Sequence, residues 1–229
     1  MRKSIVYTSK NENIVGLLYI CLQMFILPSA LALINSLLPT PLSVGAINFV
    51  FFAINFICVS VIFKRYFISS VRAVLRNPYA VLRYALFGFL LYQVGKFLVS
   101  LLILLLYPQF SNLNDTAVMD SIAQNYTLMS IGTIILAPVV EEVLYRGVVF
   151  GCLHKRNALL GYVISTVVFS LIHIVSYINL YNPIALLCSF LVYLPAGLCL
   201  AWAYDKSGNI IAPILIHIAV NQLGILYLR

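Results

Sequence analysis

Seven long apolar stretches make up most of this chain of 229 residues. They lie at approximately 14–38, 42–63, 85–107, 126–150, 161–177, 184–203 and 210–227. About 20 apolar residues are enough to cross a bilayer as a helix. Backbone inside lipid must satisfy its own hydrogen bonds, which a helix does within one segment. The sequence therefore predicts an all-α, polytopic membrane protein with about seven transmembrane helices, forming a single domain over residues 1–229.

The composition and the distribution of charge agree with this fold class. The chain is 63% hydrophobic and 9% charged, whereas soluble domains are about 45–50% apolar and about 25% charged. With the N-terminus inside, cytoplasmic segments hold 11 of the 14 Lys and Arg residues, the other three being Lys96, Arg146 and Arg229. We therefore expect a multi-pass cell-membrane protein with a cytoplasmic N-terminus, and its short, compact architecture is typical of bacterial proteins. Its net charge of +8 should serve topology and contact with anionic lipid headgroups rather than nucleic acid.

Three features lie outside the simple pattern of spans. The segment from Lys64 to Arg83 is basic with interleaved Ile, Val and Leu, which predicts an amphipathic helix along the inner membrane surface. The outer loop 108–125 carries Asp115 and Asp120, and no chemistry is indicated there. Lys96 stands amid apolar residues of the third span. We expect it to extend toward the membrane surface or to pair with a carbonyl at a helix end.

Three charged side chains stand inside the fourth apolar stretch: Glu141, Glu142 and Arg146. Because a charge at the centre of a membrane helix costs roughly 2.5–3.5 kcal/mol, such residues indicate a functional site by default. Glu142 and Arg146 are four residues apart and share a helical face, so we expect them to pair. Glu141 is rotated by about 100° from its neighbour. Its carboxylate is then available as a general base.

Polar side chains recur in the fifth and seventh stretches. His173 follows Phe169 by four residues, and Asn221 follows His217 by four, so each pair shares a helical face. Counted from the cytoplasmic ends at 1.5 Å per residue, Glu141 lies roughly 15 Å deep, His173 roughly 18 Å and His217 roughly 10 Å. Antiparallel packing would bring them together in the inner half of the bilayer. The sequence predicts one polar cavity, open to the cytosol, shared by three spans.

Two kinds of hydrolytic site fit these residues. In the first, Glu141 and His173 activate a water while His217 and Asn221 donate hydrogen bonds to an oxyanion. In the second, Glu141, His173 and His217 ligate one Zn²⁺ ion that keeps a fourth position open. Either would hydrolyse a peptide bond without a nucleophilic side chain. Neither an H-E-x-x-H nor a G-x-S-x-G sequence is present, so common zinc-protease and serine-hydrolase motifs are absent.

The ordered set of motifs resembles that of the CPBP intramembrane proteases, also called the CaaX-protease or Abi family. The family motifs E-E-x-x-x-R, F-x-x-x-H and H-x-x-x-N are matched by Glu141, Glu142 and Arg146, then Phe169 and His173, then His217 and Asn221. The resemblance covers about residues 126–225, the expected catalytic core. The helices of residues 1–125 vary in the family.

The resemblance implies an intramembrane endopeptidase that cleaves near the cytoplasmic membrane face. Glu141 and His173 would activate the water, and His217 and Asn221 would form the oxyanion site. Glu142, Arg146 and Phe169 would support them, and a metal would be optional. The substrate would be a peptide or a membrane protein. Bacterial members are linked to bacteriocin maturation or self-immunity.

Two other classes of function remain open for this sequence. One is a non-catalytic membrane protein that binds a peptide or a sensor kinase and confers immunity or regulates signalling. The other is an ion- or proton-coupled transporter, which also places carboxylates and imidazoles at mid-depth, although no internal repeat is evident. Replacement of Glu141 separates the classes. Only the enzyme requires that carboxylate for turnover.

Overall fold

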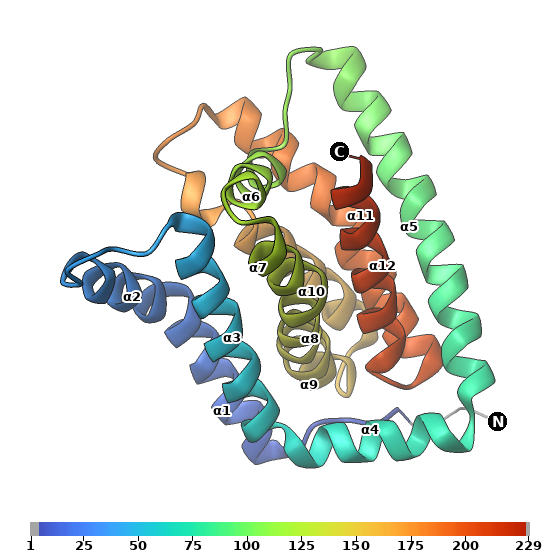
Figure 1. The fold of residues 1–229 in the computed structure, drawn as a ribbon. Coiled ribbons are helices and arrows are strands. Elements are labelled where there is room, and N and C mark those ends of the chain that lie inside the picture. The colour runs from blue at the N-terminus through green and yellow to red at the C-terminus, as the bar shows by residue number, and fades with distance from the viewer. Residues whose placement is uncertain (1–4, 228–229) are drawn as a thin grey trace.

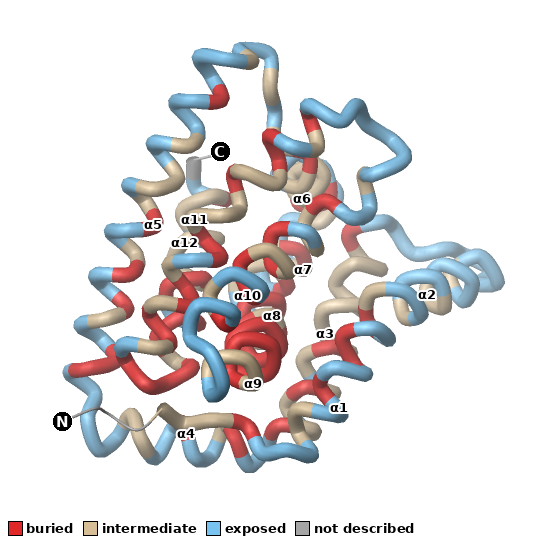
Figure 2. Tube along the Cα trace, turned by 180° about the vertical axis from the view of Figure 1, so that it is seen from behind, coloured by how far each residue is buried: buried red, intermediate tan, exposed pale blue. Residues whose placement is uncertain are grey.

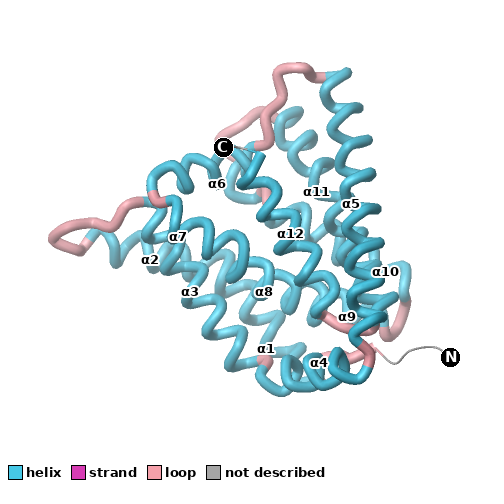
Figure 3. The backbone as a smooth tube through the Cα atoms, turned by 45° about the vertical axis from the view of Figure 1, so that its right-hand side comes forward, coloured by secondary structure: helices cyan, strands magenta, loops and turns pink. Residues whose placement is uncertain are grey.

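The computed structural model describes residues 5–227, and these form helices without any strand (Figure 3). The helices of the first half are α1 (Lys10–Cys21), the π-helical η1 (Leu22–Ile26), α2 (Leu27–Ser36), α3 (Val44–Ile62), α4 (Lys64–Arg76) and α5 (Pro78–Leu106). Those of the second half are α6 (Leu113–Gln124), α7 (Tyr126–Ile131), the π-helical η2 (Gly132–Leu136), α8 (Ala137–Glu141), the π-helical η3 (Glu142–Phe150), α9 (Gly151–His154), α10 (Ala158–Ile172), the short 3-10 helix η4 (Val175–Tyr177), α11 (Pro183–Ser207) and α12 (Ile211–Tyr227).

Seven apolar helical segments match the seven apolar stretches of the sequence. Among the described residues, five are long and apolar enough to cross a membrane: Lys10–Ser36, Val44–Ile62, Pro78–Leu106, Tyr126–His154 and Pro183–Ser207. Two are shorter, Ala158–Ile172 and Ile211–Leu226. The prediction of an all-α, polytopic membrane protein is confirmed.

The fifth apolar stretch was expected to be helical as far as residue 177, which was wrong. α10 has 15 residues and ends at Ile172, a length of about 22 Å. The ring of His173, the next residue, bonds through Nδ1 to the carbonyl oxygen of Phe169 at 2.7 Å. That carbonyl would otherwise accept the backbone N–H of His173, which instead bonds to Leu171. The histidine side chain thus competes with the helix for an acceptor, and the helix stops there.

The basic segment was expected to form one surface helix over 64–83, and it forms two elements instead. α4 ends at Arg76, and Arg83 belongs to α5. The break falls at Pro78. Proline disfavours helical geometry in the residue before it but suits the first turn of a new helix. Asn77 accordingly caps α5 by accepting the backbone N–H of Ala80 at 3.2 Å. α4 lies across one end of the bundle, and α5 runs from there along its side (Figure 1).

The core is centred on the span Tyr126–His154. All nine residues of η3 are buried, and Figure 2 shows buried residues concentrated in this central region, with exposed ones on α2 and along α5. Two glycines let α5 approach the centre closely. A Cβ atom on Gly88 would lie 2.7 Å from Cδ1 of Ile216 on α12, and one on Gly95 would lie 3.1 Å from Cβ of Pro195 on α11. α5 therefore packs one face inward and presents the other to lipid.

Candidate active site

An ion pair between Glu142 and Arg146 lies at the centre of the bundle. Nη1 of Arg146 is 3.0 Å from Oε1 of Glu142, and both side chains are 0% exposed. Nη2 of Arg146 donates to the carbonyl of Gly197 on α11 at 3.3 Å, and the guanidinium stands 4.1 Å from the ring centre of Phe169. Each of two charges this deeply buried would destabilise the fold if its partner were removed. The predicted pairing is confirmed, and Phe169 packs directly on it.

Glu142 also orients His217. Its Oε1 atom lies 2.8 Å from Nδ1 of His217, so one carboxylate oxygen holds both a guanidinium and an imidazole. A carboxylate accepts hydrogen bonds, which assigns the proton of this contact to Nδ1. The other ring nitrogen, Nε2, then faces Glu141, with 3.9 Å between Nε2 and Oε2. Glu142 thus aims His217 at the neighbouring carboxylate.

His173 also approaches Glu141 through Nε2. Because a carbonyl can only accept, the bond to Phe169 assigns the ring proton of His173 to Nδ1. Nε2 of His173 lies 3.9 Å from Oε2 of Glu141, the same separation as for His217. Oε2 itself has no hydrogen-bond partner among the described residues. The predicted convergence of a carboxylate and two imidazoles from three spans is confirmed.

Asn221 is tied to the span that carries Glu141. In η2 the backbone N–H of Ala137 bonds to the carbonyl of Gly132, five residues back. The next donor in this register is residue 138, a proline without an N–H group. The carbonyl of Thr133 therefore needs another donor, and Nδ2 of Asn221 supplies it at 2.8 Å. One N–H of the amide remains for another acceptor.

Comparison with known proteins agrees with this geometry. Residues 123–223 match the family model described as type II CAAX prenyl endopeptidase Rce1-like. A putative membrane peptidase of Bacillus subtilis, YdiL, is 31% identical over 114 residues, which cover 49% of this chain and 42% of that protein. The membrane-embedded CAAX protease MroQ of Staphylococcus aureus is 27% identical over 150 residues, covering 64% of this chain and 58% of that protein.

Over these residues the chain is similar to CAAX-type membrane proteases, in agreement with the resemblance to the CPBP family. A third relative, the UPF0177 protein YxdF of Lactococcus lactis, is 28% identical over 130 residues, or 56% of this chain and 67% of that protein. The chain spans about half the length of the first two relatives. No solved structure matches it. All seven CPBP motif residues lie within the matched segment, and the contacts above join them into one cluster.

Two cavities meet at the CPBP motif residues. The first, of about 280 Å³, has Glu141, His173, His217 and Asn221 in its wall. The second, of about 240 Å³, also borders Glu141, and its wall includes Gln23 of η1, between α1 and α2. Glu141 belongs to the walls of both. Glu141 therefore separates two neighbouring cavities.

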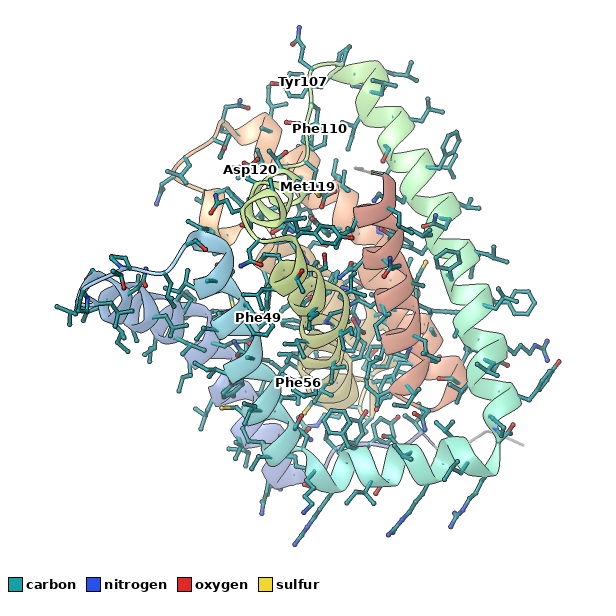
Figure 4. All side chains as sticks on the ribbon, in the orientation of Figure 1. Phe49, Phe56, Tyr107, Phe110, Met119 and Asp120 are labelled. Atoms are coloured by element: carbon teal, nitrogen blue, oxygen red, sulfur yellow. The ribbon has the colours of Figure 1, made fainter. Side chains whose placement is uncertain are left out.

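The first cavity extends away from the basic end of the molecule. Its wall includes Asn114, Asp115 and Met119 of α6, which lies at the opposite end of the bundle from α4 (Figure 1); Met119 is labelled in Figure 4. No residue between 142 and 168 lines it, because η3 is packed solid there with buried side chains such as Tyr145. The cavity therefore extends toward α6, and the expected opening to the cytosol stays a prediction.

Sequence reasoning missed a group that positions His173. The ring of Tyr193, on α11, stacks on the imidazole with centroids 4.1 Å apart. Its hydroxyl donates to Oδ1 of Asp115 at 2.8 Å and accepts from Nδ2 of Asn114 at 3.0 Å. The segment 108–125, which was expected to be a loop without chemistry, contains α6 and helps to hold Tyr193 against His173. No sequence spacing distinguishes Tyr193 among the 15 tyrosines of the chain.

Oε2 of Glu141 and Nε2 of the two histidines are the candidate ligands for a metal ion. One carboxylate oxygen and two imidazole nitrogens, each ring fixed through Nδ1, are the chemistry of a catalytic zinc site. Ligands of one tetrahedral Zn²⁺ ion lie about 3.3 Å apart at ordinary bond lengths, whereas Glu141 is 3.9 Å from each imidazole. No group of three His, Cys, Asp or Glu side chains between residues 5 and 227 forms a metal-binding cluster. The donor types fit zinc, and the two Glu141–imidazole separations are about 0.6 Å wider than those between ligands of a bound ion.

Proposed function

We propose that this protein is an intramembrane endopeptidase that hydrolyses a peptide bond with a water activated by Glu141 and His173. One observation carries the proposal. Nε2 of His173 and Nε2 of His217 each lie 3.9 Å from the unpartnered Oε2 of Glu141, beside a cavity. A separation of 3.9 Å leaves room for a water that bonds to Oε2 of Glu141 and to an imidazole Nε2 with ordinary hydrogen-bond lengths.

The two imidazoles have different roles in this proposal. His173 carries its proton on Nδ1, so in the neutral ring Nε2 is an acceptor and orients the water together with Glu141. His217 is bonded through Nδ1 to the Glu142 carboxylate. With two glutamates and one arginine in the cluster, an imidazolium at His217 gives charge balance. Its Nε2–H then serves as a hydrogen-bond donor.

The reaction follows in two proton-balanced steps. The water oxygen attacks the carbonyl carbon while Glu141 takes one of its protons. The oxyanion so formed accepts hydrogen bonds from Nε2–H of His217 and from the remaining N–H of Asn221. The carbon–nitrogen bond then breaks, and Glu141 returns the proton to the leaving amine. If a Zn²⁺ ion is used, Glu141, His173 and His217 would hold it, and it would polarise the carbonyl.

The two cavities support a polypeptide substrate. Because Glu141 borders both, a chain that crosses the carboxylate has space on each side of the bond to be cleaved. The walls are mainly apolar, with Phe52, Ala137 and Ile172 common to both cavities. A membrane-embedded peptide or the membrane segment of a protein has matching side chains. We therefore propose such a segment as the substrate class.

The surroundings of the site suggest how the protein sits in the membrane. α4 exposes Lys64, Arg65, Arg72 and Arg76, which supports contact with anionic headgroups at a cytoplasmic face. Under this orientation the cavity extends toward the opposite face, so cleavage would occur inside the membrane rather than at the cytoplasmic surface. A role in bacteriocin maturation or self-immunity stays a prediction, checked by deleting the gene and measuring peptide release and self-killing.

The decisive experiment replaces the proposed catalytic groups in liposomes of purified protein. Glu141→Gln, His173→Ala and His217→Ala should each abolish cleavage of a quenched fluorescent peptide. Asp120→Asn, an exposed carboxylate on α6, is the charge-matched control and should cleave as the wild type does. Turnover that survives all three replacements would refute the mechanism. A phenotype that survives them in cells would favour the non-catalytic partner.

A further inference from the structure

Lys96 lies on the inward face of α5, although the rest of that helix is mainly lipid-facing. The buried residues of α5 include Ala85, Gly88 and Tyr92, and Lys96 continues this stripe one turn after Tyr92. The side chain is partly buried and forms part of the wall of the first cavity. This placement favours a role at the site over extension of the side chain to the membrane surface.

Within residues 5–226, no carboxylate, carbonyl or hydroxyl forms an ion pair or hydrogen bond with the ammonium group of Lys96. Of the two acids on the same cavity wall, Asp115 is bonded to the Tyr193 hydroxyl, and Glu141 lies beside the two imidazoles. A cation at mid-span is costly and normally pairs inside the bundle. An unpaired one facing a cavity needs a negative group supplied from outside the chain.

The position of Lys96 relative to the catalytic residues follows from two helix contacts. α5 touches α12 at Gly88 and Ile216, next to His217, and touches α11 at Gly95 and Pro195. Eight residues separate Gly88 from Lys96, which is about 12 Å along the helix toward α6. An extended peptide covers this distance with three to four residues at about 3.3 Å each. A peptide cleaved at Glu141 could therefore present a nearby group to Lys96.

We propose that Lys96 binds a carboxylate of the substrate and so determines which peptides are cleaved. The inference rests on the proposed function, because it assumes that the cavity holds a peptide. The carboxylate could be the C-terminus of the peptide or an Asp or Glu side chain. Both offer the charge-assisted hydrogen bond that an ammonium group forms best.

Binding, rather than cleavage, tests this proposal. The protein carries Glu141→Gln so that probes stay intact, and the probes are fluorescent decapeptides of Ala and Leu. One pair differs only in a C-terminal carboxylate or amide. A second pair has an amide end and either Asp or Asn four residues from it. Dissociation constants in detergent micelles are measured by fluorescence anisotropy, with Lys96 intact, with Lys96→Met or Lys96→Gln, and with Lys96→Arg.

A charge-assisted hydrogen bond predicts roughly 10- to 100-fold tighter binding of one acidic probe than of its neutral partner. Lys96→Met and Lys96→Gln should remove the preference, and Lys96→Arg should retain it. Arg83→Met removes an exposed cation from the same helix and should change nothing. Equal binding of both pairs, or a preference that survives Lys96→Met, would overturn the inference. Neither result bears on turnover, so failure of the proposed function is detected separately by the cleavage assay.

Discussion

Replacement of Arg146 by Met removes one partner of the buried ion pair, and its effect on stability can be worked out from the contacts. Glu142 would keep its charge at a site that is 0% exposed, with only His217 left to face it. Breaking a buried pair from one side costs about 3–5 kcal/mol. At roughly 2–4 °C per kcal/mol for a chain of this length, the thermal midpoint should fall by about 6–20 °C.

The double variant Glu142→Gln with Arg146→Met makes this prediction sharper. Because the orphaned charge is then gone, the double variant should be more stable than Arg146→Met alone, with a coupling energy of about 2 kcal/mol or more. Thermal unfolding in detergent, followed by the accessibility of the buried Cys188 thiol, measures both. Lys206→Met breaks the more exposed pair with Asp205 and should cost less than about 1 kcal/mol. Arg146→Met with the stability of the wild type would refute the reasoning.

Three further predictions concern the cavity. Asn221→Ala should lower kcat by roughly 10²–10³ and also lower the thermal midpoint, since the Thr133 carbonyl loses its donor; an unchanged kcat would contradict the oxyanion role. Tyr193→Phe keeps the ring on His173 but loses the bond to Asp115, so it should retain more activity than Tyr193→Ala, and equal losses would show that stacking is not what matters. Chelation with EDTA should leave peptide cleavage unchanged, because the donor atoms are spaced for a water; loss of activity that Zn²⁺ restores would instead favour the zinc site.

The contacts within one helix were predictable from the sequence, and so was the meeting of three spans. The pairing of Glu142 with Arg146 needs only the four-residue spacing, and η3 preserves it even with π-helical geometry. Depth counted along each span brought Glu141, His173 and His217 to similar levels. These inferences use only the rise and periodicity of helices, which the sequence determines locally.

Which cavity wall these residues share was not predictable, because it depends on how the ends of the bundle are packed. Aromatic residues of η3 fill the basic end, whereas α6 leaves space at the other. The helix α6 was not predicted, because it has only 12 residues and is polar for a helix of a membrane protein. The bond from Glu142 to His217 was missed for a related reason. It joins residues 75 positions apart, and helix rotation, which no spacing reveals, decides which glutamate an imidazole meets.

The pattern of satisfied and unsatisfied groups favours catalysis over a purely structural role. Arg146 and Nδ1 of His217 are both held by Glu142, and Nδ1 of His173 and the Asn221 amide are held by backbone carbonyls. Glu142 and Arg146 keep one free atom each, but both groups are already paired. Among the described residues, Oε2 of Glu141 has neither a hydrogen bond nor a basic partner closer than 3.9 Å. Packing alone would select against a buried carboxylate of this kind. Its retention beside two oriented imidazoles is what a hydrolase requires and what a passive peptide-binding protein does not.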